Sequence, residues 1–233
     1  MPRTPLTLAE ANSLVQPLVG LPVSLPWKGY GSAIFLELGS LAPLQHSRQH
    51  HNKGEACISI EWDWRIEEGA KVLYGSSNSR PDIERGIEGL RGVSVEKLLV
   101  HGQVPELLIQ FSNGQRLMSA AMVTGDPEWS IRLPEATWVS CEGGVVYVGG
   151  GSGTGTTAEE EATFAHAERT AKRWGVPVAE PNKGRCDNCK WFVCIDGEGH
   201  LLDFGVCTSS ASPFDGRVVN VASGCGAFLH EET

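Results

Sequence analysis

The sequence predicts an α+β fold, in which an antiparallel sheet carries one or two helices and a small four-cysteine zinc-ribbon-like module follows. Short alternating apolar segments, separated by turn residues, fill residues 33–148. Five glycines then lie within the nine residues 149–157, and four cysteines with metal-ligand spacing come after them. We therefore expect an α+β domain over 1–148, a glycine-rich linker over 149–157, a linking helix over 158–175 and a zinc-binding module over 176–233.

The amino-terminal segment is predicted to contain a capped helix. Thr7 and Glu10 have the spacing of a capping box, which favours a short helix that ends at about Gln16. A connection punctuated by prolines and glycines follows at 19–31.

The next segment is predicted to form two strands around a polar loop. Residues 33–38 make the first strand, and the loop covers 41–54. Residues 56–66 alternate almost strictly, so we expect a strand that places Trp62 and Trp64 on the same core face as Ile58 and Ile60. In the same strand Cys57 falls out of phase with this face.

The remaining part of the sheet domain is predicted to be a helix followed by a meander. Proline suits the first turn of a helix, which favours a helix over 81–90. Ser112-Asn113-Gly114 is a strong hairpin signal, because Asn and Gly both tolerate positive φ. The expected strands are 71–74, 93–101, 107–111, 115–119, 129–133, 138–141 and 145–148.

The glycine-rich segment 149–157 is interpreted as a linker. A phosphate-binding loop requires a lysine after its last glycine, and here Thr156-Thr157 stands at that place. Past the linker, Thr157 and Glu160 form a second capping-box pattern, and apolar residues recur at helical spacing up to Trp174.

Composition excludes several classes of partner. The chain has 233 residues, with 19 Lys and Arg against 28 Asp and Glu, so its net charge is −9. Such a charge makes general attraction to nucleic acid or to an anionic membrane unfavourable. The sequence shows no apolar run of membrane-spanning length and no secretory signal. We therefore expect a cytoplasmic protein without membrane contact, whose seven cysteines are reduced or bind metal.

Four cysteines carry the main chemical signal. Cys186 and Cys189 form a CxxC pair, and Cys207 and Cys225 each follow after 17 further residues. Zinc favours four thiolates in a tetrahedron, and a shell filled by cysteines leaves no position for a reactive water. The predicted site is therefore a structural zinc site, with a redox CxxC and unligated thiols as the alternatives.

Other residues compete as ligands. Cys194 lies within an apolar segment, where a free cysteine behaves as a small hydrophobe, and His200 or His230 could replace one sulfur. A separate histidine-rich segment in the loop 41–54 is interpreted as a surface loop rather than a metal site, because it lacks helical periodicity. Its histidines are His46, His50 and His51.

No catalytic constellation is evident. Cys57 and Cys141 could each be a nucleophile, but no sequence feature supplies a base for either. We therefore expect a binding protein rather than an enzyme, with a zinc-dependent or cysteine hydrolase as the alternative.

The amino-terminal part resembles small uncharacterised bacterial proteins of an immunity or accessory type. The resemblance covers about 18–148 and is carried by Trp64-Arg65-Ile66-Glu67, by the GS-x-x-S turn 75–79 and by the hairpin 111–117. It implies a protein that neutralises a partner toxin. The acidic charge suits the masking of a basic active site.

The carboxy-terminal part resembles the cysteine-rich tail of an uncharacterised actinobacterial family. The matching segments are Cys186–Cys189, Phe204–Cys207, Ser212–Val219 and Gly224–Ala227. This resemblance implies a small zinc-binding module and supports Cys207 and Cys225 over Cys194 as ligands.

Overall fold

The chain divides into two compact units, Met1–Thr154 and Gly155–Thr233. The computed structural model describes residues 3–29, 31–43, 52–122, 128–149, 169, 173–175, 184–186, 189–195, 204–221 and 223–230. Within those ranges, no helix has the length and apolar character needed to cross a membrane.

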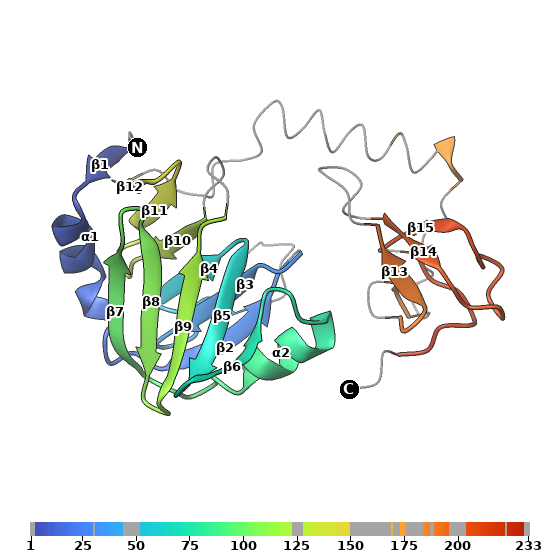
Figure 1. The fold of residues 1–233 in the computed structure, drawn as a ribbon, viewed down its shortest axis with the longest axis horizontal. Helices are drawn as coiled ribbons and strands as arrows, with labels where there is room; N and C mark the ends of the chain where they lie inside the picture. The colour runs from blue at the N-terminus through green and yellow to red at the C-terminus, as the bar shows by residue number, and fades with distance from the viewer. Residues whose placement is uncertain are drawn as a thin grey trace. The chain divides into compact units, whose positions relative to one another are not determined.

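The first unit contains two antiparallel sheets that face each other (Figure 1). In spatial order, the seven-stranded sheet consists of β1 (Thr4–Leu6), β12 (Val145–Val148), β11 (Trp138–Glu142), β10 (Trp129–Arg132), β4 (Ala56–Ile60), β3 (Ile34–Leu38) and β2 (Val23–Lys28). The five-stranded sheet consists of β6 (Lys71–Gly75), β5 (Asp63–Glu68), β9 (Gln115–Ala120), β8 (Glu106–Phe111) and β7 (Val95–His101).

One hydrophobic core lies between the two sheets. Alternate residues of each strand point inward, as the two-residue period of a strand requires. Ile58 and Ile131 come from the seven-stranded sheet, Ile66 and Ile109 from the five-stranded sheet, and each is at most 1% exposed. Burial of these side chains is the main stabilising contribution to the sandwich.

The predicted α+β class is wrong, because the described residues form fifteen strands in three antiparallel sheets and two short α-helices. The two α-helices are short: α1 spans Leu8–Val15 and α2 spans Arg80–Glu88, and a 3-10 turn, η1, covers Gln16–Leu18. Helix α1 instead covers a strand edge. Its Asn12 side chain donates to the carbonyl of Val100 in β7 and accepts from the Val100 amide, both at 2.8 Å.

The connection at 19–31 also contains a strand, β2, with Pro26 in its middle. Proline cannot donate a ladder hydrogen bond, so it is confined to edge strands, and β2 is the last strand of its sheet. A further strand, β1, pairs with β12 at the opposite edge. Neither strand was expected from the sequence, so the β content is higher than predicted.

The expected strand 56–66 is divided between the two sheets. It ends as β4 at Ile60 and resumes as β5 at Asp63, where the chain passes from the seven-stranded to the five-stranded sheet. Trp64 is 3% exposed and lies in the core as expected. Trp62 is 45% exposed because it lies at the corner between the strands, so its predicted place in the core is wrong.

The second unit contains a three-stranded antiparallel sheet in the order β13 (Phe192–Cys194), β14 (Phe204–Cys207) and β15 (Val218–Asn220). Most of the expected linker 149–157 and helix 158–175 lies outside the described residues. Among the described residues, no group of three or more His, Cys, Asp or Glu side chains is arranged to hold a metal ion. In place of the predicted four-cysteine zinc-ribbon-like module, the structure shows a small three-stranded sheet, and zinc binding by its cysteines stays a prediction.

Candidate metal centre

Two tight turns present cysteines on facing segments of the second unit. The amide of Cys189 donates to the carbonyl of Cys186 at 3.1 Å, which closes the CxxC turn. The amide of Phe228 donates to the carbonyl of Cys225, also at 3.1 Å, and closes a second turn of the same size. In each turn, a cysteine is the first residue, and its carbonyl accepts a hydrogen bond from the residue three positions later.

Backbone hydrogen bonds hold these two turns together. The amide of Lys190 donates to the carbonyl of Leu229 at 2.9 Å, and Cys189 and His230 form an isolated antiparallel bridge. The amide of Cys186 donates to the carbonyl of Ser223 at 2.7 Å. The segment that carries the last cysteine therefore lies beside the CxxC turn, although about 40 residues separate them in sequence.

Strand β14 supplies the fourth cysteine. Cys207 is the last residue of β14, and its amide donates to the carbonyl of Arg217 while its own carbonyl accepts from Gly216. These two bonds close the loop that connects β14 to β15. Cys207 faces the same side of the sheet as Val219, which is fully buried.

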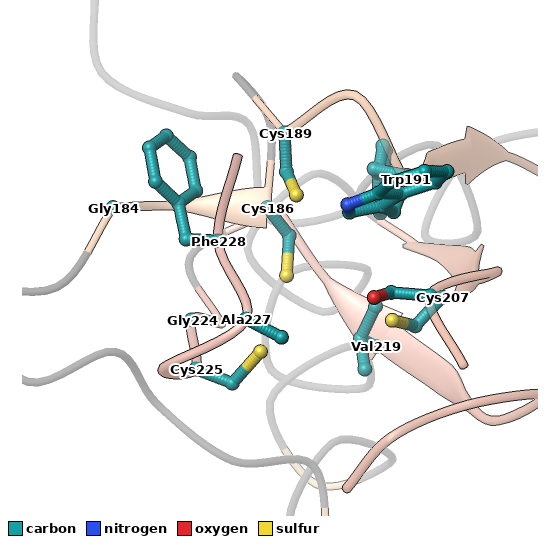
Figure 2. Close-up of a pocket in the computed structure, with 12 residues that line it drawn as sticks. Gly184, Cys186, Cys189, Trp191, Cys207, Val219, Gly224, Cys225, Ala227 and Phe228 are labelled. Atoms are coloured by element: carbon teal, nitrogen blue, oxygen red, sulfur yellow. The ribbon is translucent and has the colours of Figure 1, made fainter. Parts of the chain in front are cut away.

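All four predicted ligands line one small cavity of about 10 Å³ (Figure 2). Cys186, Cys189 and Cys225 direct their sulfurs toward the same space, and Cys207 lies across from them beside Val219. Trp191, Phe192 and Phe228 form part of the wall. The cavity is therefore a sulfur-lined space with apolar surroundings.

The four sulfurs differ in their access to solvent. Cys186 and Cys207 are 7% and 6% exposed, whereas Cys189 and Cys225 are half-buried. The seven cysteines, which all lie among the described residues, form no disulfides in this structure. The side chains as they stand share a cavity, but they are not drawn into a coordination shell.

The competing ligands lie elsewhere or outside the described residues. Cys194 is exposed on β13, and its sulfur lies 3.5 Å from the carbonyl oxygen of Ile195 and not in the wall of the cavity. His230 makes an edge contact with Phe228, with ring centroids 6.2 Å apart. His46, His50, His51 and His200 lie outside the described residues.

One polar contact to the cluster was not found from the sequence. The hydroxyl oxygen of Ser212 lies 3.3 Å from the sulfur of Cys225, and Ser212 is 8% exposed. A serine 13 residues before a cysteine follows no recognised spacing. Successive turns between Ser209 and Arg217 hold the backbone of Ser212.

The two cysteines of the first unit have the properties of core residues. Burial raises the pKa of the Cys57 thiol well above its usual range, and the nearby charge of Glu37 raises it further. Burial, followed by the charge of Glu128, raises the pKa of Cys141 to about 12. Since the thiolate is the nucleophilic form of cysteine, neither residue is activated for attack near neutral pH.

Comparison with known proteins bears on this part of the chain. Residues 152–233 match a family described as a protein of unknown function (DUF3027). The match includes the four cavity cysteines and excludes the sandwich. No curated protein and no solved structure matches the chain. The expected toxin partner, the immunity role and the hydrolase alternative therefore stay predictions from the sequence.

Proposed function

We propose that the second unit binds one zinc ion through Cys186, Cys189, Cys207 and Cys225, and that this ion has a structural role. The observation that carries the proposal is the shared cavity, because four thiols from three separate segments line it. Convergence of this kind is what a closed metal site requires, and CxxC spacing alone does not provide it.

The chemistry of the wall favours zinc. Thiolates are soft ligands that select zinc, copper(I) or iron–sulfur clusters over magnesium and calcium. A cavity of about 10 Å³ suits one ion. With Zn–S bonds of about 2.3 Å, a tetrahedral shell places its sulfurs about 3.8 Å apart.

The size of the second unit explains why an ion would be needed there. Among its described residues, the buried cluster consists of Cys186, Cys207 and Val219, with Phe192 and Phe214 packed against it. A cluster of this size contributes little against the conformational entropy of the described residues that surround it. A structural metal commonly supplies the missing stability in small domains.

A filled cysteine shell also favours a structural role over catalysis. Catalytic zinc sites keep one position open for water or substrate, whereas four protein ligands close the shell. The hydrolase alternative loses its thiol nucleophiles as well, since the pKa values of Cys57 and Cys141 are raised.

Metal analysis of the full chain tests this proposal. We expect native mass spectrometry and elemental analysis to find one zinc per chain, and Cys225→Ser to bind it more than tenfold more weakly. Cys194→Ser is the matched control, because this cysteine is exposed and does not line the cavity. A wild-type chain that takes up no zinc under reducing conditions would contradict the proposal, as would equal losses in the two variants.

A further inference from the structure

We infer that Ser212 is a positioning residue for the metal site, whose hydroxyl donates a hydrogen bond to the Cys225 thiolate. The inference rests on the proposed function, because it assigns a role within the same site. It starts from the 3.3 Å contact between the Ser212 oxygen and the Cys225 sulfur.

The direction of this contact follows from the chemistry of the two groups once the thiol is ionised. The amide of Phe214 donates to the Ser212 hydroxyl oxygen at 3.0 Å, so one lone pair of that oxygen is already used. The hydroxyl has one proton to give, and a thiolate has only lone pairs to offer. Ser212 is therefore the donor and Cys225 the acceptor once the thiol is ionised.

The turn that carries Ser212 is itself held in place. The amide of Ser212 donates to the carbonyl of Ser209 at 2.9 Å, and the amide of Asp215 donates to the carbonyl of Ser212 at 3.2 Å. Because Ser212 is 8% exposed, water has little access to compete for its hydroxyl. The donor is thus pre-oriented toward the sulfur before any metal binds.

The position of this bond has a chemical consequence. Cys225 is half-buried, whereas Cys186 and Cys207 are almost completely buried, so packing confines the Cys225 side chain less. A hydrogen bond from a fixed hydroxyl holds the Cys225 sulfur in one orientation, as partners of metal ligands commonly do.

The test compares zinc release from full-length variants. Wild type, Ser212→Ala, Ser212→Thr and Thr208→Val are loaded with zinc, and the rate of its transfer to 4-(2-pyridylazo)resorcinol is measured at pH 7. Thr208→Val is the control, because its hydroxyl lies in the same loop and donates to the carbonyl of Trp191 rather than to a sulfur. Removal of an outer partner commonly lowers metal affinity about 10- to 100-fold.

We expect Ser212→Ala to release zinc about tenfold faster than wild type, because the Cys225 sulfur loses the partner that orients it. Ser212→Thr keeps the hydroxyl and should restore the wild-type rate, and Thr208→Val should match wild type. If Ser212→Ala fails to load zinc while Ser212→Thr loads normally, the inference also stands. Equal release rates in Ser212→Ala and wild type would overturn it, as would equal effects of Ser212→Ala and Thr208→Val. Absence of zinc from the wild type itself would instead overturn the proposed function.

Discussion

Replacement of Arg132 by methionine is expected to destabilise the sandwich strongly. The guanidinium of Arg132 donates to the Glu37 carboxylate at 2.9 Å and to the carbonyl oxygens of Gly54 and Glu55 at 3.0 and 3.1 Å. Arg132 is 6% exposed and Glu37 is 8% exposed. Methionine keeps the apolar stem but removes all three hydrogen bonds, and it leaves a buried carboxylate without its counter-charge.

The expected cost follows from that burial. Breaking a buried ion pair by removing one partner costs about 3–5 kcal/mol, because the remaining charge stays desolvated. With a urea dependence of about 2 kcal/mol/M, the unfolding midpoint should fall by about 2 M. Urea unfolding of the full chain, followed by circular dichroism, measures this shift.

Two further variants distinguish loss of the buried ion pair from loss of an arginine in general. Arg91→Met breaks the pair that Arg91 makes with Glu88 on the surface, and exposed pairs contribute at most about 1 kcal/mol. The double variant Glu37→Leu with Arg132→Met removes both charges, so it should be more stable than Arg132→Met alone. A loss below 1 kcal/mol in Arg132→Met, or a double variant less stable than the single one, would refute the reasoning.

Two other substitutions test the sandwich. Glu128 is 7% exposed, and its pKa is raised first by burial and then by the charge of Glu106, so its ionised form destabilises the fold as pH rises above the unfolded pKa. Glu128→Gln should therefore raise the thermal midpoint at pH 7 and lose this advantage near pH 4; an equal gain at both pH values would contradict the assignment. Gly86→Ala should destabilise the protein by about 1–3 kcal/mol in thermal unfolding, because the new Cβ would lie 2.5 Å from the Tyr74 ring. This clash outweighs the better helix propensity of alanine. A stabilised variant would contradict this prediction and show that the ring moves freely.

Local patterns predicted most strands but not their distribution between sheets. The hairpin around Asn113-Gly114 could be located because its turn chemistry is local, and Gly114 indeed has a φ of +85°. The passage from β4 to β5 could not be located, because the alternation of apolar residues continues through Ile60 and Trp64 on both sides of the corner. A strand that passes from one sheet to the other keeps its inner face toward the same core. The period of the apolar residues therefore predicts one continuous strand.

The same limit applies to the class of the fold. Pro26 interrupts the pattern of β2, and the sequence does not state that β2 lies at an edge where proline is tolerated. The capping box of α1, with Thr7 and Glu10, correctly indicates a helix, but it says nothing of its role. Because Asn12 attaches α1 to the edge of β7, the helix closes the β-sandwich instead of forming a second layer.

In the second unit, two glycines lie against aromatic rings that line the sulfur cavity. Neither Gly184 nor Gly205 has a positive φ, so a left-handed backbone does not explain a glycine at either position. A Cβ on Gly184 would lie 2.3 Å from the Phe228 ring, and a Cβ on Gly205 would lie 2.4 Å from the Phe192 ring. Both rings also line the sulfur cavity, so the two glycines make room for its aromatic walls. A cavity walled in this way suits an ion held for stability, since a reactive centre requires an approach for water and substrate.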